Sequence, residues 1–106
     1  MAIIGDALAD GQLPAAEGVL YTVPASTVAY IKSIVYSNTH AANTNVCLIL
    51  VRLDGANSRR LIRVPLYTNE QLYYDEALTL EAADEIRGHA TNANEVDYVI
   101  SGAEET

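Results

Sequence analysis

The sequence is poor in several residue types, and each shortage excludes a class of structure. Its single cysteine, Cys47, cannot form an internal disulfide, and because it lies in the apolar run VCLILV we expect a buried, unreactive thiol. No run approaches the ~18 consecutive apolar residues that a membrane-spanning helix needs. The opening segment MAIIGDALADGQLP lacks the basic start and long apolar stretch of a secretory signal peptide, so we expect no export by that route.

Basic residues are also scarce. Six lysines and arginines stand against 14 aspartates and glutamates, which gives the 106-residue chain a net charge of -8. Such a charge opposes direct binding to nucleic acid or to an anionic membrane surface. We therefore expect neither as a partner.

Catalytic and metal-binding signatures are absent from the sequence. The two histidines, His40 and His89, lie in loop-like surroundings without carboxylates at metal-ligand spacing, so we expect both to be solvated. One acidic cluster lacks the pattern of a calcium-binding loop, and a solvated acidic rim is favoured over a calcium site. The cluster consists of Asp75, Glu76, Glu81, Asp84 and Glu85. We expect no catalytic residue, cofactor or metal, and an enzyme is the weakest hypothesis.

Strand-forming residues, by contrast, are abundant. Runs rich in valine, isoleucine, threonine and tyrosine predict strands at 19–23, 27–38, 46–53, 59–64 and 95–101. The run at 46–53 is apolar on both faces, as expected of a central strand. A hairpin turn is predicted at Asp54-Gly55, and Pro65 is expected to end the second strand because proline donates no hydrogen bond to a ladder.

The segment 69–88 permits two interpretations. It contains good helix formers, and Gly88 is a suitable stop for a helix. However, Leu78 and Leu80 alternate with polar residues, and EAAD at 81–84 could be a tight link between strands. Two short strands are favoured, and the helix remains an alternative. The predicted fold is all-β, an antiparallel β-sandwich or jelly roll of about eight short strands formed by residues 19–106.

Residues 1–18 are expected to form an irregular N-terminal arm. Glycines and a proline at positions 5, 11, 14 and 18 interrupt both helical and extended patterns. Exposed apolar side chains on such an arm need a cover, and a neighbouring subunit would provide it. The arm residues expected at this interface are Ile3, Ile4, Leu8 and Leu13.

Charged residues are unevenly distributed along the chain. Ten of the fourteen carboxylates lie at or after Glu70, whereas Arg59, Arg60 and Arg63 lie together on the predicted hairpin. Alternation places Arg59 and Arg63 on one face of the strand and Arg60 on the other. The segregation is either chance patchiness or a sign of docking, in which these arginines meet an acidic surface.

All seven aromatic residues are tyrosines, with no phenylalanine or tryptophan. Tyrosine combines a large apolar ring with a hydroxyl that tolerates water, so it is enriched at interfaces. We expect Tyr98 and one of Tyr30 or Tyr36 in the core. The tyrosines expected at an interface or facing a ligand are Tyr67, Tyr73 and Tyr74.

Two motifs carry a resemblance to a known family. Residues 21–34 read Y-x-V-P-A-x-T-x-x-x-I-K-S-I, and a later strand is followed by a short acidic turn and D-x-I-R at 84–87. Over about residues 19–104 the chain resembles a small β-sandwich module of tailed-bacteriophage virion proteins. That family usually has glycine before the aspartate, where this chain has Ala83.

The resemblance implies a jelly-roll-like structural protein of the virion. It suggests a capsid decoration, or cement, protein that forms a homotrimer and binds the major capsid protein on the outer surface of the head, assembled in the host cytoplasm. One alternative is a tail, neck or fibre-base component. Another is a carbohydrate-binding module, in which Tyr67, Tyr73 and Tyr74 would form the binding platform.

Overall fold

The computed structural model describes residues 3–41, 44–52 and 57–106. Within these residues the chain forms nine strands and no helix, and so no helix that could cross a membrane. The strands are β1 (Ile3–Gln12), β2 (Gly18–Thr22), β3 (Val28–Asn38), β4 (Thr44–Arg52), β5 (Asn57–Leu66), β6 (Gln71–Tyr74), β7 (Leu78–Leu80), β8 (Glu85–Ala90) and β9 (Val96–Glu105).

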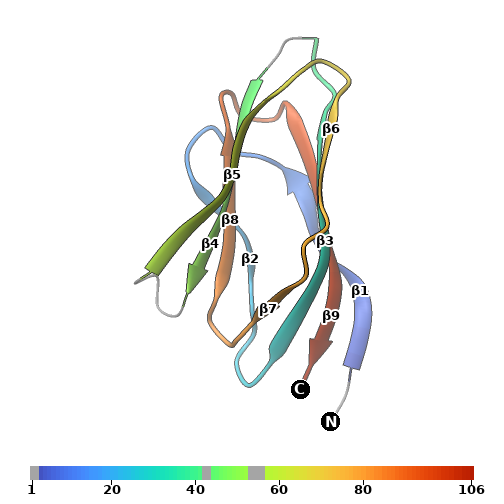
Figure 1. Ribbon diagram of the computed structural model, residues 1–106, viewed down its shortest axis with the longest axis vertical. Helices are drawn as coiled ribbons and strands as arrows, with labels where there is room; N and C mark the ends of the chain where they lie inside the picture. The colour runs from blue at the N-terminus through green and yellow to red at the C-terminus, as the bar shows by residue number, and fades with distance from the viewer. Residues whose placement is uncertain (1–2, 42–43, 53–56) are drawn as a thin grey trace.

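The strands form two antiparallel sheets that pack face to face (Figure 1). Sheet A has the order β1-β9-β3-β6, with β7 also paired to β3, and sheet B has the order β2-β8-β4-β5. The pairing is nested, because β1 pairs with β9, β2 with β8, β3 with β6 and β7, and β4 with β5. This is the topology of a jelly roll. The predicted sandwich or jelly roll is confirmed, with nine strands in place of about eight.

The core lies between the two sheets. Alternate residues of β3, β8 and β9 point inward and are buried, as the patterns around Ile34, Ile86 and Ile100 illustrate. Tyr36 is also buried, and its hydroxyl crosses the core to donate a hydrogen bond of 3.1 Å to the Cys47 carbonyl oxygen in sheet B. The sheets are therefore joined by a polar contact as well as by apolar packing.

The central strand of sheet B is buried on both faces, as predicted for the run at 46–53. β4 lies between β8 and β5. Its inward residues belong to the main core, and its outward residues form a second buried cluster. The outward cluster, here called the outer strip, consists of Cys47, Ile49 and Val51. Cys47 is 2 % exposed, which confirms the buried thiol.

The hairpin β4–β5 also matches its prediction, apart from its end. The turn predicted at Asp54-Gly55 lies outside the described residues. Pro65 does not end β5, which continues to Leu66. Because β5 is an edge strand that pairs, within the part of the chain that the structure describes, only with β4, it can hold a residue without an N–H, provided that residue's nitrogen faces away from the ladder.

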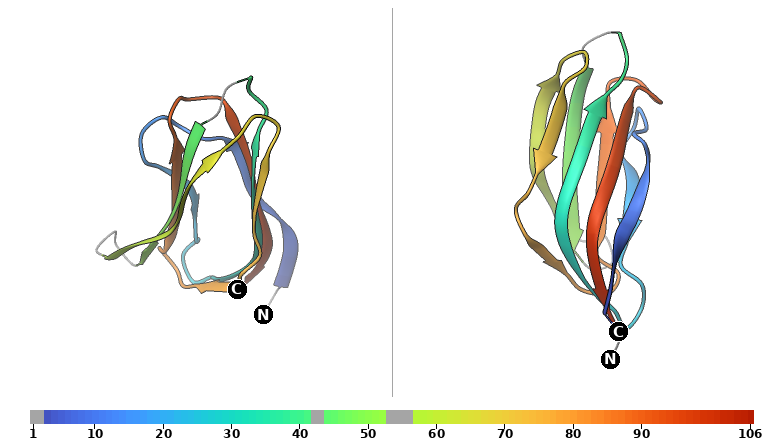
Figure 2. Two further views of the ribbon diagram at one scale, coloured as in Figure 1. Left: turned by 45° about the horizontal axis from the view of Figure 1, so that its top comes forward. Right: turned by 90° about the vertical axis from the view of Figure 1, so that its right-hand side faces the viewer.

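The N-terminal segment differs from its prediction. Ile3–Gln12 form β1, which pairs with β9 along its whole length, with one bulge between Ala7 and Ala9 (Figure 2, right). The prediction of an irregular arm is therefore wrong for these ten residues. Alanine and glycine give little visible alternation, and Gly11 has a φ of 155°, a conformation that residues with a Cβ rarely adopt.

The contested segment forms strands. β7 and β8 are joined by the tight turn at 81–84, in which the Asp84 N–H donates to the Glu81 carbonyl oxygen at 3.0 Å. The two-strand interpretation is confirmed and the helix is wrong. Ala83, at the third position of the turn, has a φ of 74°, the left-handed conformation that a type II turn requires there. Alanine thus occupies a position that favours glycine.

Candidate interaction surfaces

The arginines of the predicted hairpin lie on β5, and a β-bulge determines on which face of sheet B each of them lies. One extra residue of β5 is inserted between the partners of Leu48 and Ile49. As a result, Arg63 lies opposite Cys47 and Arg60 lies opposite Ile49. Opposed residues of an antiparallel pair share a face, so Arg60 and Arg63 both lie on the outer face of sheet B.

This arrangement corrects the predicted one. Simple alternation placed Arg59 with Arg63, but the bulge reverses the alternation between positions 60 and 63. Arg59 lies opposite Leu50, which points into the core, and is itself exposed at the sheet edge. The pair that shares a face is therefore Arg60 and Arg63.

The arginines of sheet B differ in their partners. On β8, Arg87 contacts Glu85 at 2.6 Å and Glu17 at 3.2 Å, and these hydrogen bonds, the one to Glu85 first, raise the pKa of Arg87. Among the described residues, no carboxylate lies within ion-pair distance of Arg60 or Arg63. Both arginines are exposed, so a partner can reach them.

A pocket of about 290 Å³ opens on the same outer face, next to Arg63. Cys47 and His89, paired across β4 and β8, both line it. The other lining residues include Ala15, Asn45 and Thr91. His89 was predicted as a solvated loop residue, but it is half-buried within β8, so that prediction is wrong. His40 lies in an exposed loop as expected, with its Nε2 3.3 Å from Glu95 Oε1.

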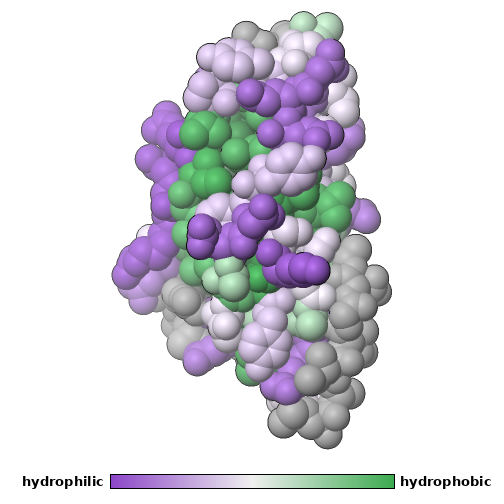
Figure 3. Space-filling view, turned by 45° about the vertical axis from the view of Figure 1, so that its right-hand side comes forward, coloured by the Kyte–Doolittle hydropathy of each residue, from purple (hydrophilic) through white to green (hydrophobic). Residues whose placement is uncertain are grey.

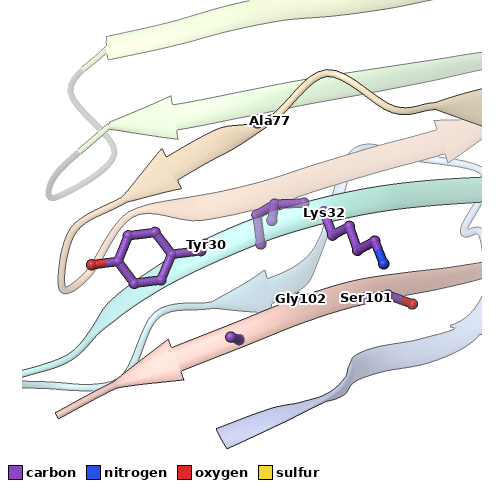
Figure 4. A pocket seen from close by; sticks show the side chains of 7 residues that line it. Tyr30, Lys32, Ala77, Ser101 and Gly102 are labelled. Carbon is purple, nitrogen blue, oxygen red and sulfur yellow. The ribbon is translucent and has the colours of Figure 1, made fainter. Parts of the chain in front are cut away.

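A second depression, of about 570 Å³, lies on the outer face of sheet A (Figure 4). Tyr30 and Lys32 of β3 flank it, Ser101 and Gly102 of β9 lie beside them, and Ala77 borders it from the β6–β7 connection. The Tyr30 hydroxyl donates to a carboxylate oxygen of Glu105 at 2.9 Å, which orients the exposed ring. The depression thus has the aromatic ring of Tyr30 and the positive charge of Lys32 in its lining.

Three tyrosines were predicted at an interface, and the structure separates them. Tyr67 and Tyr73 are 54 % and 58 % exposed, whereas Tyr74 is half-buried and packs against the core. Tyr73 and Tyr74 are neighbours in β6, so their side chains point to opposite faces of sheet A. The three rings cannot form a single platform for a sugar.

Apolar side chains do reach the surface of sheet A. Tyr73 lies opposite Val35, and Val35 lies opposite Val99, which is 40 % exposed. In Figure 3, which brings the sheet A side forward, hydrophobic areas reach the surface between hydrophilic side chains. This face suits a partner of mixed polarity.

The structure places the predicted arm residues in different environments. Leu13 is fully buried in the protein's own core, and its N–H donates to the Val96 carbonyl oxygen at 2.8 Å, so the prediction that a neighbour covers it is wrong. Leu8 is half-buried and packs against the same core. The side chains of Ile3 and Ile4 lie outside the described residues, although their backbones pair with β9.

The jelly roll also sorts charge by sheet, which the sequence did not reveal. The strands of sheet B contain all five arginines and a single carboxylate, Glu85. The strands of sheet A contain a single cation, Lys32, and five carboxylates, namely Asp6, Asp10, Asp97, Glu104 and Glu105. The sorting depends on strand order, since the topology places β8 beside β4 although 32 residues separate them in the sequence.

The acidic cluster does not form a metal site in the described part of the chain. No group of three or more histidine, cysteine, aspartate or glutamate side chains there is arranged to hold a metal ion. Asp84 is buried in its turn and accepts a hydrogen bond from the Glu81 N–H, while Glu85 pairs with Arg87. These two carboxylates of the cluster therefore have separate structural roles.

Comparisons with known proteins give a similarity in fold only. No protein-family model and no curated protein matches the chain. Among solved structures, the chain is similar to one in "Structure of infectious bursal disease virus Gx strain", with a TM-score of 0.59 and 8 % identity over 97 % of this chain and 32 % of that chain. A chain in "Structure of infectious bursal disease virus Gt strain" has a TM-score of 0.39 at 8 % identity and the same coverage. This protein thus spans about a third of the length of those chains.

Proposed function

We propose that the protein is a structural component of a virion, specifically a capsid decoration protein bound to the outer surface of the head. The observation that carries the proposal is the jelly-roll fold, together with the structural similarity of 97 % of this chain to part of a chain in a virus structure. Jelly rolls recur in viral capsids, but a fold alone does not determine a function. The surfaces of the molecule must therefore also suit the role.

Both sheets expose groups that suit docking. Sheet B presents two arginines without an ion-pair partner among the described residues, and sheet A presents the exposed rings of Tyr30 and Tyr73. Arginine and tyrosine are the residue types enriched in protein interfaces. The partner would be the major capsid protein, and contacts between copies would form a homotrimer.

The mechanism would be mass action without catalysis. A protein that binds the assembled, expanded lattice and not its separate subunits stabilises that lattice by RT ln(1 + [L]/Kd). The decoration protein would join the head on its outer surface, in the host cytoplasm. Its contribution would be resistance of the head to heat and to internal pressure.

Sedimentation with heads tests this role. Purified protein is mixed with expanded, tail-less heads of the virus that encodes it, and we expect it to co-sediment with them and to raise their disruption temperature. Recovery of the protein only with purified tails would instead identify a tail, neck or fibre-base component. Imaging of the intact virion gives the location independently. A carbohydrate-binding module is not favoured, because Tyr67, Tyr73 and Tyr74 do not form a platform.

A further inference from the structure

The outer face of sheet B carries a regular arrangement of cations over an apolar floor. Cys47 of the outer strip lies between Arg63 and His89, and Ile49 lies between Arg60 and Arg87, because each is paired on both sides within the sheet. Cys47 and Ile49 are thus each flanked by two basic side chains, whereas Val51, the third residue of the strip, lies between Ser58 and Glu85. The strip itself is almost inaccessible to water.

Arg60 and Arg63 are the side chains of this face best suited to bind an anion. The bulge makes them consecutive outward positions on β5, opposite residues two apart on β4, so their backbones are about 7 Å apart. Arg87 forms ion pairs with two glutamates, whereas Arg60 and Arg63 have no ion-pair partner among the described residues. Two guanidinium groups beside an apolar floor interact more strongly with an anion than they would in bulk water.

We propose that Arg60, Arg63 and the pocket beside Arg63 and His89 bind carboxylate side chains of a protein partner, and that sheet B is the face turned toward the capsid. The second part rests on the proposed function. The pocket supplies polar groups of Asn45 and Thr91 in addition to the cation, which suits a carboxylate with several acceptor sites. Guanidinium groups match the planar fork of a carboxylate.

Charge favours a protein partner over a nucleic acid. The net charge of -8 repels a phosphate polymer as a whole, and Glu17 and Glu85 lie beside the arginines on the same face. Individual carboxylates of a folded partner can approach Arg60 and Arg63 without meeting those groups. Sheet A, whose strands carry five carboxylates, is then the face left toward solvent.

A peptide titration tests the carboxylate site without any assumption about a virion. The ¹⁵N-labelled protein is titrated with hexaglutamate at low salt, with hexaglutamine as the neutral control. We expect amide shifts around Arg60, Arg63 and His89 and none in β3 or β9. The double variant Arg60→Gln/Arg63→Gln should bind at least about tenfold more weakly. Lys32→Gln, which removes one charge from sheet A, should bind like the wild type.

Three outcomes of the titration would overturn the site. They are shifts centred on sheet A, equal affinity of the double variant and the wild type, and tighter binding of a short DNA duplex than of hexaglutamate, which would point to a phosphate partner. Thermal unfolding of each variant confirms that it is folded. Because Arg60 and Arg63 are exposed, we expect both variants to unfold at nearly the wild-type temperature.

Head binding tests the orientation separately. If wild-type protein binds expanded heads and Arg60→Gln/Arg63→Gln binds at least tenfold more weakly, sheet B faces the capsid. Equal binding by that variant would overturn the orientation and leave the decoration role intact. If wild-type protein binds no heads while hexaglutamate still binds at the arginines, the decoration role fails and the carboxylate site stands.

Discussion

Gly88 lies on β8 directly beneath the hydroxyl of Tyr36. A Cβ added to Gly88 would lie 2.5 Å from that hydroxyl and 2.9 Å from the Cys47 carbonyl oxygen. The same hydroxyl donates to the same carbonyl, so the cross-sheet hydrogen bond occupies the space that a side chain would need. Glycine at position 88 is therefore a packing requirement, not a consequence of backbone conformation.

We predict that Gly88→Ala lowers the free energy of unfolding by about 3 kcal/mol, because a well-packed core does not absorb an extra methyl group. Tyr36→Phe should cost about 1 kcal/mol through the lost hydrogen bond. The double variant should cost less than the sum, since removing the hydroxyl relieves the closer contact. Urea unfolding of the four proteins measures this, and strictly additive losses would contradict the proposed contact.

Ala83 offers the opposite test. A left-handed conformation destabilises a residue with a Cβ by about 1 to 2 kcal/mol, and glycine avoids this cost. Part of the gain is lost, because glycine has more conformational freedom in the unfolded chain, which favours unfolding. We predict that Ala83→Gly raises the free energy of unfolding by about 1 kcal/mol, measured by urea unfolding. Ala82→Gly is the matched control, since φ at position 82 is not positive, and it should be destabilising. A gain at both positions would contradict the explanation.

Among the elements, β1 is the strand whose role is least apparent from its residues. Among the described strands β1 is an edge strand that pairs only with β9, and β9 lies between β1 and β3. Loss of β1 would leave one side of β9 without hydrogen-bond partners and would uncover the Tyr98 ring next to Gly11.

We predict that deletion of residues 1–12 lowers the free energy of unfolding by roughly 3 kcal/mol or more, because an entire ladder and its packing are lost. Hydrogen exchange followed by mass spectrometry should show faster exchange of β9 amides. The amides of β4, which keep both their neighbours, are the internal control. Unchanged exchange in β9 would mean that residues 1–12 form a dispensable arm.

The success of sequence-based prediction differed between elements for physical reasons. β3, β4 and β9 carry large apolar residues in alternating or continuous patterns, and their existence could be predicted. β1 could not, because its alanines and glycines leave no clear alternation in the sequence. The arginine cluster on β5 was visible in the sequence, but the pairing of Arg60 with Arg63 was not. A bulge inserts one residue without leaving a recognisable pattern, and only the register reveals it.

At the scale of the whole molecule, two tyrosine hydroxyls connect the sheets. Tyr21 of β2 donates to Glu104 of β9, and Tyr36 of β3 donates to the Cys47 carbonyl oxygen. Burial, the larger cause, and the neighbouring Glu104 raise the pKa of Tyr21, and burial raises the pKa of Tyr36. The folded protein therefore keeps both phenolic protons at a pH where the unfolded chain loses them.

This difference in tyrosine protonation between the folded and unfolded states predicts how the free energy of unfolding changes at alkaline pH. Below the unfolded tyrosine pKa of about 10 both states hold the protons, and the full stability contribution is present. As the pH rises above about 10 only the unfolded state releases them, so the free energy of unfolding should fall by about 1.4 kcal/mol per pH unit for each tyrosine. Urea unfolding between pH 8 and 11 measures the slope. An unchanged slope in Tyr21→Phe/Tyr36→Phe would exclude these two groups as the cause.

The nested pairing of the jelly roll also sets an order of events during folding. The hairpin β4–β5 joins strands that are close in sequence, whereas Gln12 at the end of β1 meets Asp97 in β9 across 85 residues. Closing the longer loops costs more chain entropy, so we expect β4 and β5 to gain protection first in pulsed hydrogen exchange and β1 last, with folding on the millisecond-to-second scale. Until β9 is available, β1 remains an unpaired strand. The yield of native protein in a cell would then depend on how quickly the two ends of the fold meet.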